Sequence, residues 1–435
     1  MERHITLFLF FLLLTDTFAQ NAVSRRSTFY LFNGPSGANV REFNAMLEQK
    51  GLSSMRNGYT SNGIGYQAQV NDFDLGVELY HNNGPRSTFR EYEVDYRTTR
   101  LFLNVGYSMI EEGGFNLMHY MSLGMGYMNF QMLKEAEFGN IEEFLANPEQ
   151  GFILRKYNIH RGSQYFGGFL TEIGFQLGYD INIPGLEEAL ELVTKFGYAF
   201  SPFENAWNLN GISFDNIQSG AFVRFGAGIT LTDKNMFYSD ATLGVHFIYG
   251  QNFNSPEALN PFLENHGYSP LPDVRGNFGL KIIGENRRVM YGMEVMNLST
   301  FNRANEDFTQ TLNSVRVYGN LGLQLYKRKN LELGLLGGLG YGNLRYTLEK
   351  DGKPDFPLLF EEPDHDGTLV SRGLMMKPEV LIAYAMPLSS FKIFNLVYSI
   401  HAGYELPIGN YPLANLNMAS FMRGPYLQFG LGFRP

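Results

Sequence analysis

The feature that most constrains this chain is an internal duplication. Two pairs of segments resemble each other, namely 41–54 with 258–271 and 220–229 with 424–433. Three charged residues between these anchors align with charged residues of the same type, namely Glu78 with Glu294, Arg100 with Arg316 and Glu172 with Glu379. A repeat of this length predicts a structure made of two homologous halves.

Strict alternation of apolar and polar residues runs through both halves. Leu101, Leu103 and Val105 share one face of a segment, whereas Arg100 and Asn104 share the other. Such a period of two residues predicts β-strands. The segments run for ten residues or more, which is the length that a tilted strand needs to cross a bilayer, whereas strands of soluble sandwiches are shorter.

The connections between these segments sort into two kinds that alternate along the chain. Tight turns are predicted at 71–72, 111–114, 232–235, 284–287 and 327–329, and long connections at 34–61, 133–164, 201–218, 252–273, 299–312, 349–373 and 406–423. All the tight turns therefore fall at one end of the strands and all the long connections at the other. This segregation is typical of outer-membrane barrels.

The predicted fold class is thus all-β: a transmembrane antiparallel β-barrel of about 16 strands, formed from two homologous 8-strand halves. Two tandem 8-stranded barrels are equally compatible with a duplication. We favour the single barrel at this point because the junction at 232–235 is as tight as the other turns, whereas a linker between independent domains tends to be longer.

Composition and the N-terminal residues indicate a location in the cell envelope. Arg3 and His4 precede an apolar run over 5–14, and 17–19 read as a cleavage site, so 1–19 is predicted to be a secretory signal peptide. The barrel is then expected over 20–435, with repeat halves 20–234 and 235–435. The sequence holds no cysteine, and its net charge of −9 speaks against nucleic acid as a partner.

These features together resemble Gram-negative outer-membrane β-barrel proteins, in the Gly-, Tyr- and Phe-rich style of the Bacteroidota. In the last strand Leu427, Phe429, Leu431 and Phe433 alternate, which is similar to the C-terminal assembly signal of that class, although Arg434 and Pro435 follow the last aromatic residue. The resemblance implies a location in the cell outer membrane. It also implies outer-membrane lipid and the barrel assembly machinery as partners, and no specific functional family is matched.

The charged residues on the inward faces are the candidate site. They are Glu78, Arg100, Glu172, Lys195, Arg224, Arg275, Lys281, Glu294, Arg316 and Glu379. Ionised groups inside a barrel must pair with each other or contact water. They either form a charged constriction that selects solutes or a static network that fills a narrow interior.

A segment with helical periodicity occurs once in each half, at 41–50 and 256–265. It is predicted to be either a plug over the barrel mouth or a surface helix that packs on loops. The acidic residues at 361–366 are expected to form a solvated loop.

The sequence contains no motif of an enzyme, a metal site or a cofactor site. Two functions remain. One is a channel or uptake protein for small polar solutes, which the expected strand count favours because sixteen strands usually enclose water. The other is a non-conducting structural barrel that acts as a scaffold for other envelope proteins in a surface or secretion assembly.

Overall fold

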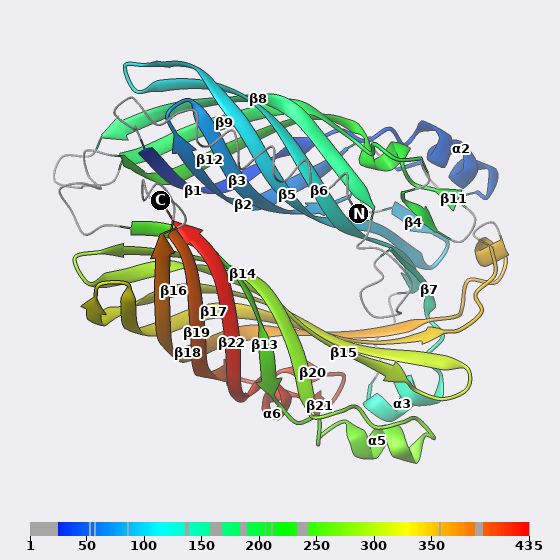
Figure 1. The fold of residues 1–435 in the computed structure, drawn as a ribbon. Coiled ribbons are helices and arrows are strands. Elements are labelled where there is room, and N and C mark those ends of the chain that lie inside the picture. Colours follow the sequence, from blue (N-terminus) through cyan, green and yellow to red (C-terminus); the bar gives the residue numbers. More distant parts are fainter. Residues whose placement is uncertain are drawn as a thin grey trace, which may run out of the picture.

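The protein is a pair of closed antiparallel β-barrels (Figure 1). The computed structural model describes residues 25–434 except 52–53, 56–57, 85–86, 135–138, 157–167, 183–188, 205, 210–211, 233–241, 356–357 and 388–394. Among the described residues, no helix has the length and apolarity to cross a membrane. The all-β fold class is confirmed.

Each barrel has eight strands, and the strands follow chain order around it. The first barrel consists of β1 (Arg25–Ser36), β2 (Tyr59–Val70), β3 (Phe73–Asn83), β5 (Tyr92–Glu112), β6 (Phe115–Lys134), β8 (Phe169–Asn182), β9 (Ala189–Phe200) and β12 (Gly220–Thr232). The second consists of β13 (Thr242–Phe253), β14 (Val274–Asn286), β15 (Val289–Arg303), β16 (Phe308–Arg328), β17 (Leu331–Lys350), β18 (Gly367–Pro387), β19 (Asn395–Ile408) and β22 (Gly424–Arg434).

The closing strand pairs decide between the two predicted architectures. β1 pairs with β12, so that Phe29 lies opposite Ile229, and β13 pairs with β22, so that Tyr249 lies opposite Phe429. The preference for one sixteen-stranded barrel is therefore wrong, and the alternative of two tandem barrels is correct. Alternation sets which face of a strand is apolar, but it does not set which strand closes the sheet. The predicted turn at 232–235 falls in 233–241, outside the described residues apart from Thr232.

The predicted segregation of turns and loops is confirmed. The long connections of both barrels lie on the same side of the molecule, where α2, α3, α5 and β7 are found at the right of Figure 1. The turns at the other end include left-handed residues such as Asn71, Gly113 and Lys329, which reverse the chain within a few residues.

The connections at the loop end contain short elements of their own. These are α2 (Arg41–Gln49), β4 (Ser87–Phe89), α3 (Ile141–Ala146), β7 (Gly151–Lys156), β10 (Asn208–Leu209), β11 (Ile212–Ser213), η1 (Asn216–Gln218), α5 (Asn260–Asn265), η2 (Leu358–Phe360), β20 (Pro412–Leu413), β21 (Leu416–Asn417) and α6 (Ala419–Met422). The predicted loop 299–312 is instead mostly strand, because β15 and β16 extend to leave only 304–307 between them.

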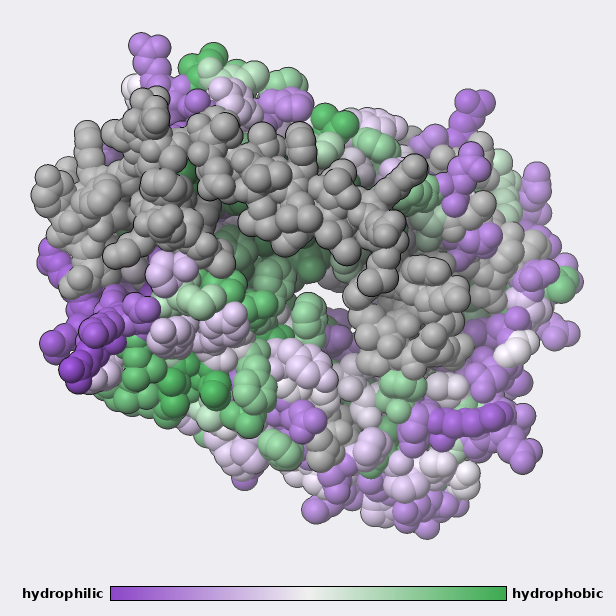
Figure 2. All heavy atoms as spheres, in the orientation of Figure 1, coloured by the Kyte–Doolittle hydropathy of each residue, from purple (hydrophilic) through white to green (hydrophobic). Residues whose placement is uncertain are grey.

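The outer faces of the strands are apolar and exposed. Large side chains such as Leu103, Leu123, Phe225, Leu321 and Leu339 are each more than half exposed. Figure 2 shows this hydrophobic surface in green on the barrel walls. Both barrels also carry a β-bulge at the same place in the repeat, between Ser108 and Ile110 and between Gln324 and Tyr326.

The two barrels touch along part of these outer faces. A cluster of buried side chains joins them and includes Tyr66, Val77, Leu243, Val245 and Ile282. The Tyr66 hydroxyl donates to the backbone oxygen of Leu243 at 3.1 Å, so a polar group on an outer face gains a partner in the other barrel.

Loops of the two barrels also contact each other at the loop end of the molecule, and Asp366 lies at the centre of that contact. The Asp366 carboxylate, which is fully buried, accepts from the backbone nitrogens of Ile153 at 2.7 Å and Lys350 at 2.8 Å, and from the Lys353 ammonium at 2.6 Å. Gly151 and Asp366 form a β-bridge.

Asp364 adds to this contact between the barrels. Its carboxylate accepts from the Tyr92 hydroxyl at 2.8 Å and from the Lys134 ammonium at 2.7 Å. The expectation of a solvated acidic loop at 361–366 is therefore wrong for these two aspartates, because they bind groups of the first barrel.

Candidate functional site

Nine of the ten predicted charges lie inside the two lumens, where solvent does not reach them. These nine are at most 1 % exposed, namely Glu78, Arg100, Glu172, Lys195, Arg224, Lys281, Glu294, Arg316 and Glu379. The tenth, Arg275, lies in β14 opposite Asn252, and its side chain is outside the description. The charges fall at three levels along each barrel, which are described in turn.

At the middle level of the first barrel, two ion pairs cross the lumen. Arg224 of β12 binds Glu172 of β8 in a bidentate manner, with Nη1–Oε2 and Nη2–Oε1 distances of 2.8 and 2.6 Å. The guanidinium stacks on the Tyr80 ring, 3.9 Å from its centroid. Lys195 binds Glu78. An arginine side chain binds a carboxylate most strongly when the contact is bidentate and the guanidinium stacks on an aromatic ring.

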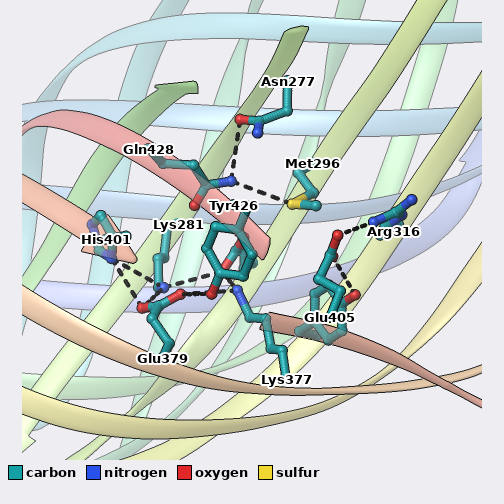
Figure 3. Close-up of polar contacts among 12 residues, drawn as sticks. Asn277, Lys281, Met296, Arg316, Lys377, Glu379, His401, Glu405, Tyr426 and Gln428 are labelled. Atoms are coloured by element: carbon teal, nitrogen blue, oxygen red, sulfur yellow. Dashed lines mark hydrogen bonds and ion pairs between the residues drawn. The ribbon is translucent and has the colours of Figure 1, made fainter. Parts of the chain in front are cut away.

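At the middle level of the second barrel, the charges form one connected network rather than two pairs (Figure 3). Lys281 lies between Glu294 and Glu379, and Lys377 bridges the same two carboxylates at 2.5 and 3.1 Å. The Tyr426 hydroxyl donates to Glu379 at 2.7 Å. Two ammonium groups thus balance two carboxylates in the same small volume.

The strand register shows why the two networks differ. Ser122 and Gly338 are counterparts in the repeat, and they lie opposite Glu172 and Lys377, respectively. Glu172 therefore corresponds in space to Lys377. The sequence alignment of Glu172 with Glu379 is therefore displaced by two residues. At the true counterpart position, the acidic Glu172 of the first copy is replaced by the basic Lys377 of the second.

At the turn end, each lumen is crossed by an arginine that the candidate list did not contain. Arg26 binds Asp180 with both terminal nitrogens and Glu191 at 2.9 Å. In the second barrel, Arg434 binds Glu332 in a bidentate manner, with one contact at 3.0 Å. Inward alternation was the signal for Glu191 and Lys377, because they share a strand face with the chosen residues Lys195 and Glu379, respectively.

At the loop end of the first barrel, the segment 201–219 folds into the mouth. Arg100 binds the Tyr59 hydroxyl and the Gln218 amide oxygen, the latter at 2.7 Å. Trp207 and Phe214 are fully buried beside these groups. Gly168 is required here, because a Cβ atom at that position would overlap the Trp207 indole ring.

The equivalent segment of the second barrel, 409–423, occupies the other mouth. Arg316 binds Glu405, and the Tyr318 hydroxyl donates to the same carboxylate at 2.6 Å. Met422 lies over Arg316, with its sulfur 3.8 Å from Nη2. We call 201–219 and 409–423 the mouth loops.

The two segments that were predicted to be either plugs or surface helices packed on loops form α2 and α5. α2 forms within 41–50 and packs Phe43 and Leu47 into the cluster that holds Trp207. α5 is shorter than the predicted 256–265 and places Leu263 in a cluster with Phe144 of α3, a helix of the first barrel. α2 thus contacts Phe214 of the first mouth loop and Phe130 of strand β6, whereas α5 packs on the loop helix α3. The residues over Arg100 and Arg316 come from the mouth loops.

One cluster in the second lumen has the order of a catalytic triad. Ser399 Oγ lies 3.0 Å from His401 Nε2, and His401 Nδ1 lies 2.9 Å from Glu379 Oε1. However, Ser399 is 4 % and His401 0 % exposed, so the hydroxyl is enclosed in the lumen. Among the described residues, no group of His, Asp and Glu side chains is arranged to hold a metal ion.

The described lumens therefore contain charged groups at three levels and a filled mouth. These groups form ion pairs at every level except the loop end of the first barrel, where Arg100 binds the neutral Tyr59 and Gln218. Eight strands enclose a volume that side chains can fill, which is what these barrels show. The argument for a wide aqueous lumen depended on sixteen strands in one barrel, and it does not apply to this architecture.

Comparisons with known proteins do not assign the chain to a family. No family model matches it, and no curated protein matches it. Among solved structures, the toluene transporter TodX of P. putida is 11% identical and aligns over 97% of this chain and 91% of its own, with a TM-score of 0.22. The translocator domain of the autotransporter NalP from Neisseria meningitidis is 7% identical over 100% of this chain and 95% of its own, with a TM-score of 0.19. The outer membrane protein OprD from Pseudomonas aeruginosa is 8% identical over 95% of this chain and 94% of its own, with a TM-score of 0.20.

These three proteins are outer-membrane β-barrels, the class that the sequence resembles. Superpositions with such low TM-scores carry no argument about what this chain transports or binds.

Proposed function

We propose that this protein is a tandem outer-membrane barrel that does not conduct, and that serves as a scaffold presenting a joined layer of loops. The observation that carries the proposal is the complete burial of the ion pairs in both lumens, such as Arg224 with Glu172 and Lys281 with Glu379. An aqueous path through a barrel would have to pass these levels, and it would leave their side chains accessible to water.

The membrane location is supported by the distribution of polarity. Charged residues are inside and large apolar residues are outside, which is the reverse of a soluble barrel. Leu103, Leu123 and Leu321 are each more than half exposed, so outside a bilayer each would cost about 1–2 kcal/mol in unfavourable transfer free energy.

The scaffold role is supported by the length of the strands and by the joined loops. β5 and β16 have 21 residues each, whereas a tilted strand crosses a bilayer with about 10. Most of the excess lies at the loop end, where the contact around Asp366 holds the two barrels together. The result is a single raised surface made by two barrels, which is suited to a protein partner in a surface or secretion assembly.

Conductance of the purified protein in planar bilayers tests the proposal. We expect a silent barrel, and we expect Trp207→Ala, which thins the first mouth loop, to remain silent because the ion pairs below it persist. Stable openings of the unmodified protein would overturn the scaffold function.

A gated channel for small polar solutes is the second candidate, and one observation favours it. Asn104 and its repeat counterpart Asn320 have both side-chain polar atoms buried without a hydrogen-bond partner among the described residues. A buried amide usually binds water in that situation, so the turn-end half of each lumen is expected to hold water. Openings that appear only after deletion of residues 411–421 would favour this channel over the scaffold.

A further inference from the structure

The turn-end half of the first lumen contains a buried carboxylate without an ion pair among the described residues. Asp74 is the second residue of β3 and is 4 % exposed, and its Oδ1 atom has no hydrogen-bond partner. Lys195 attracts Asp74 electrostatically, but the Lys195 ammonium binds Glu78. Other carboxylates inside this lumen each bind a lysine or an arginine, namely Glu78, Glu172, Asp180 and Glu191. Because burial of an ionised carboxylate without a counter-charge is strongly unfavourable, Asp74 requires a group that neutralises it.

Two neutral polar side chains beside Asp74 also lack hydrogen-bond partners. Asn104 of β5 lies directly opposite Ser122 of β6. These residues alternate with the exposed Leu103 and Leu123, so their side chains point into the lumen. Both are at most 2 % exposed, and every polar atom of the two side chains is without a partner. Buried polar atoms that the protein does not satisfy are normally satisfied by water or by an ion.

The strand register brings the three side chains together. Asp74 lies opposite Gly106, and Asn104 lies opposite Gly76. Asp74 and Asn104 are therefore diagonal neighbours on the inner face, and the Cβ atoms of such neighbours are about 7 Å apart. This is a separation that one ion between the two side chains can bridge. Met118 packs over Gly106, so the carboxylate has an apolar neighbour on that side.

The second barrel retains the amide of this group without the acid. Asn320 holds the equivalent amide position, and both of its side-chain polar atoms also lack a partner. Met290 replaces Asp74 and Gly338 replaces Ser122, each 216 residues later. An amide alone is expected to bind water, so the carboxylate and the hydroxyl distinguish the first lumen from the second.

We propose that Asp74, Asn104 and Ser122 bind a monovalent cation of the sodium type. Their carboxylate, amide and hydroxyl oxygens are hard ligands, which bind hard cations, and water completes the coordination. The single carboxylate balances a single positive charge, whereas calcium sites generally use several acidic ligands. The amide nitrogen of Asn104 then donates to a coordinated water molecule. Glu111 and Glu112, which are exposed at the same end of the barrel, attract cations to it.

Equilibrium dialysis of the purified protein in detergent against radioactive sodium, with choline as the competing salt, tests the proposal. A mildly alkaline buffer keeps a carboxyl group with an ordinary pKa ionised. We expect a single saturable sodium site per chain. Asp74→Asn should abolish it, because the amide keeps the shape of the side chain and removes the charge. Asp72→Asn is the matched control, since Asp72 is exposed in the adjacent turn and its loss should leave the site intact.

The stability of the first barrel provides a second measurement. Unfolding is followed by the fluorescence of Trp207, the only tryptophan, in sodium chloride and in choline chloride at equal ionic strength. At a sodium concentration of about ten times the dissociation constant, the ratio of folded to unfolded protein should be about tenfold higher than in choline. Asp74→Asn and Asp74→Met should both fold and remove this difference, because neither variant buries the charge. Asp74→Met installs the residue of the second barrel.

The two measurements distinguish a cation from a proton at Asp74. A protein that binds no sodium, or binding that survives Asp74→Asn, would overturn the proposal. A stability that rises on acidification but is equal in sodium and choline would show that a proton neutralises Asp74, and it would also overturn the proposal. The site lies outside the proposed scaffold function, and neither measurement depends on conductance, so the two proposals stand or fall separately.

Discussion

Removing one partner of the Arg224–Glu172 pair is predicted to destabilise the first barrel strongly. Both side chains are 0 % exposed, and the pair is bidentate. Arg224→Gln leaves a carboxylate in the lumen without its cation, which costs about 3–5 kcal/mol for a buried ion pair. Glutamine should fit, because Gln428 holds the corresponding position in the second barrel.

The double variant Glu172→Gln with Arg224→Gln separates the cost of an unpaired charge from that of lost packing. Two amides leave no net charge buried, so the double variant should cost only about 1–2 kcal/mol, mainly from the lost stacking of Arg224 on Tyr80 and Phe222. If Glu172→Gln costs as much as Arg224→Gln, the coupling energy of the double-mutant cycle is about 4 kcal/mol or more.

Denaturant unfolding in micelles, followed by tryptophan fluorescence, measures these differences. Trp207 is the only tryptophan of the chain and is buried in the first mouth loop, so its signal reports on the first barrel. Lys50→Gln is the control, because Lys50 and Glu361 form an exposed pair whose loss should cost less than about 1 kcal/mol. If Arg224→Gln also costs less than about 1 kcal/mol, water reaches the lumen charges and the argument for a closed barrel is refuted.

Two further predictions concern the closure of the first barrel and the contact between the loops. The double variant Thr28→Cys with Thr230→Cys should form a disulfide, because these residues lie opposite each other in β1 and β12. The double variant Thr28→Cys with Gln428→Cys should show no crosslink on gels. The reverse result would restore the single barrel. Asp366→Ala should accelerate hydrogen exchange at 151–154 by more than tenfold while both barrels stay folded, because it removes the acceptor that binds β7; unchanged exchange would contradict the role of Asp366 as the centre of the loop contact. Exchange of the β5–β6 turn serves as the internal reference.

Much of this fold could be predicted because its strongest signals are local. Alternation fixes the two faces of each strand, and turn residues fix the end at which the chain reverses. The partner of β1 could not be predicted, since β12 and β22 show the same outward pattern and differ mainly in inward residues such as Arg224 and Gln428. The lumen networks were only partly predictable because Glu172, Lys377 and Glu379 depend on strand register, which sequence alignment misplaced by two residues.

The closure of each barrel within its own half has a consequence for the order in which the chain folds. β1 meets β12 after about 200 residues have emerged, so the first sheet has all its strands before any strand of the second sheet is present. Shorter loops between pairing strands close faster and at lower entropic cost. The first barrel is therefore complete within its own half of the chain, and the second can assemble against its finished wall at Tyr66 and Val77. A chain truncated after Thr232 retains every strand of its barrel, whereas the same cut in a single sixteen-stranded sheet would leave two open edges.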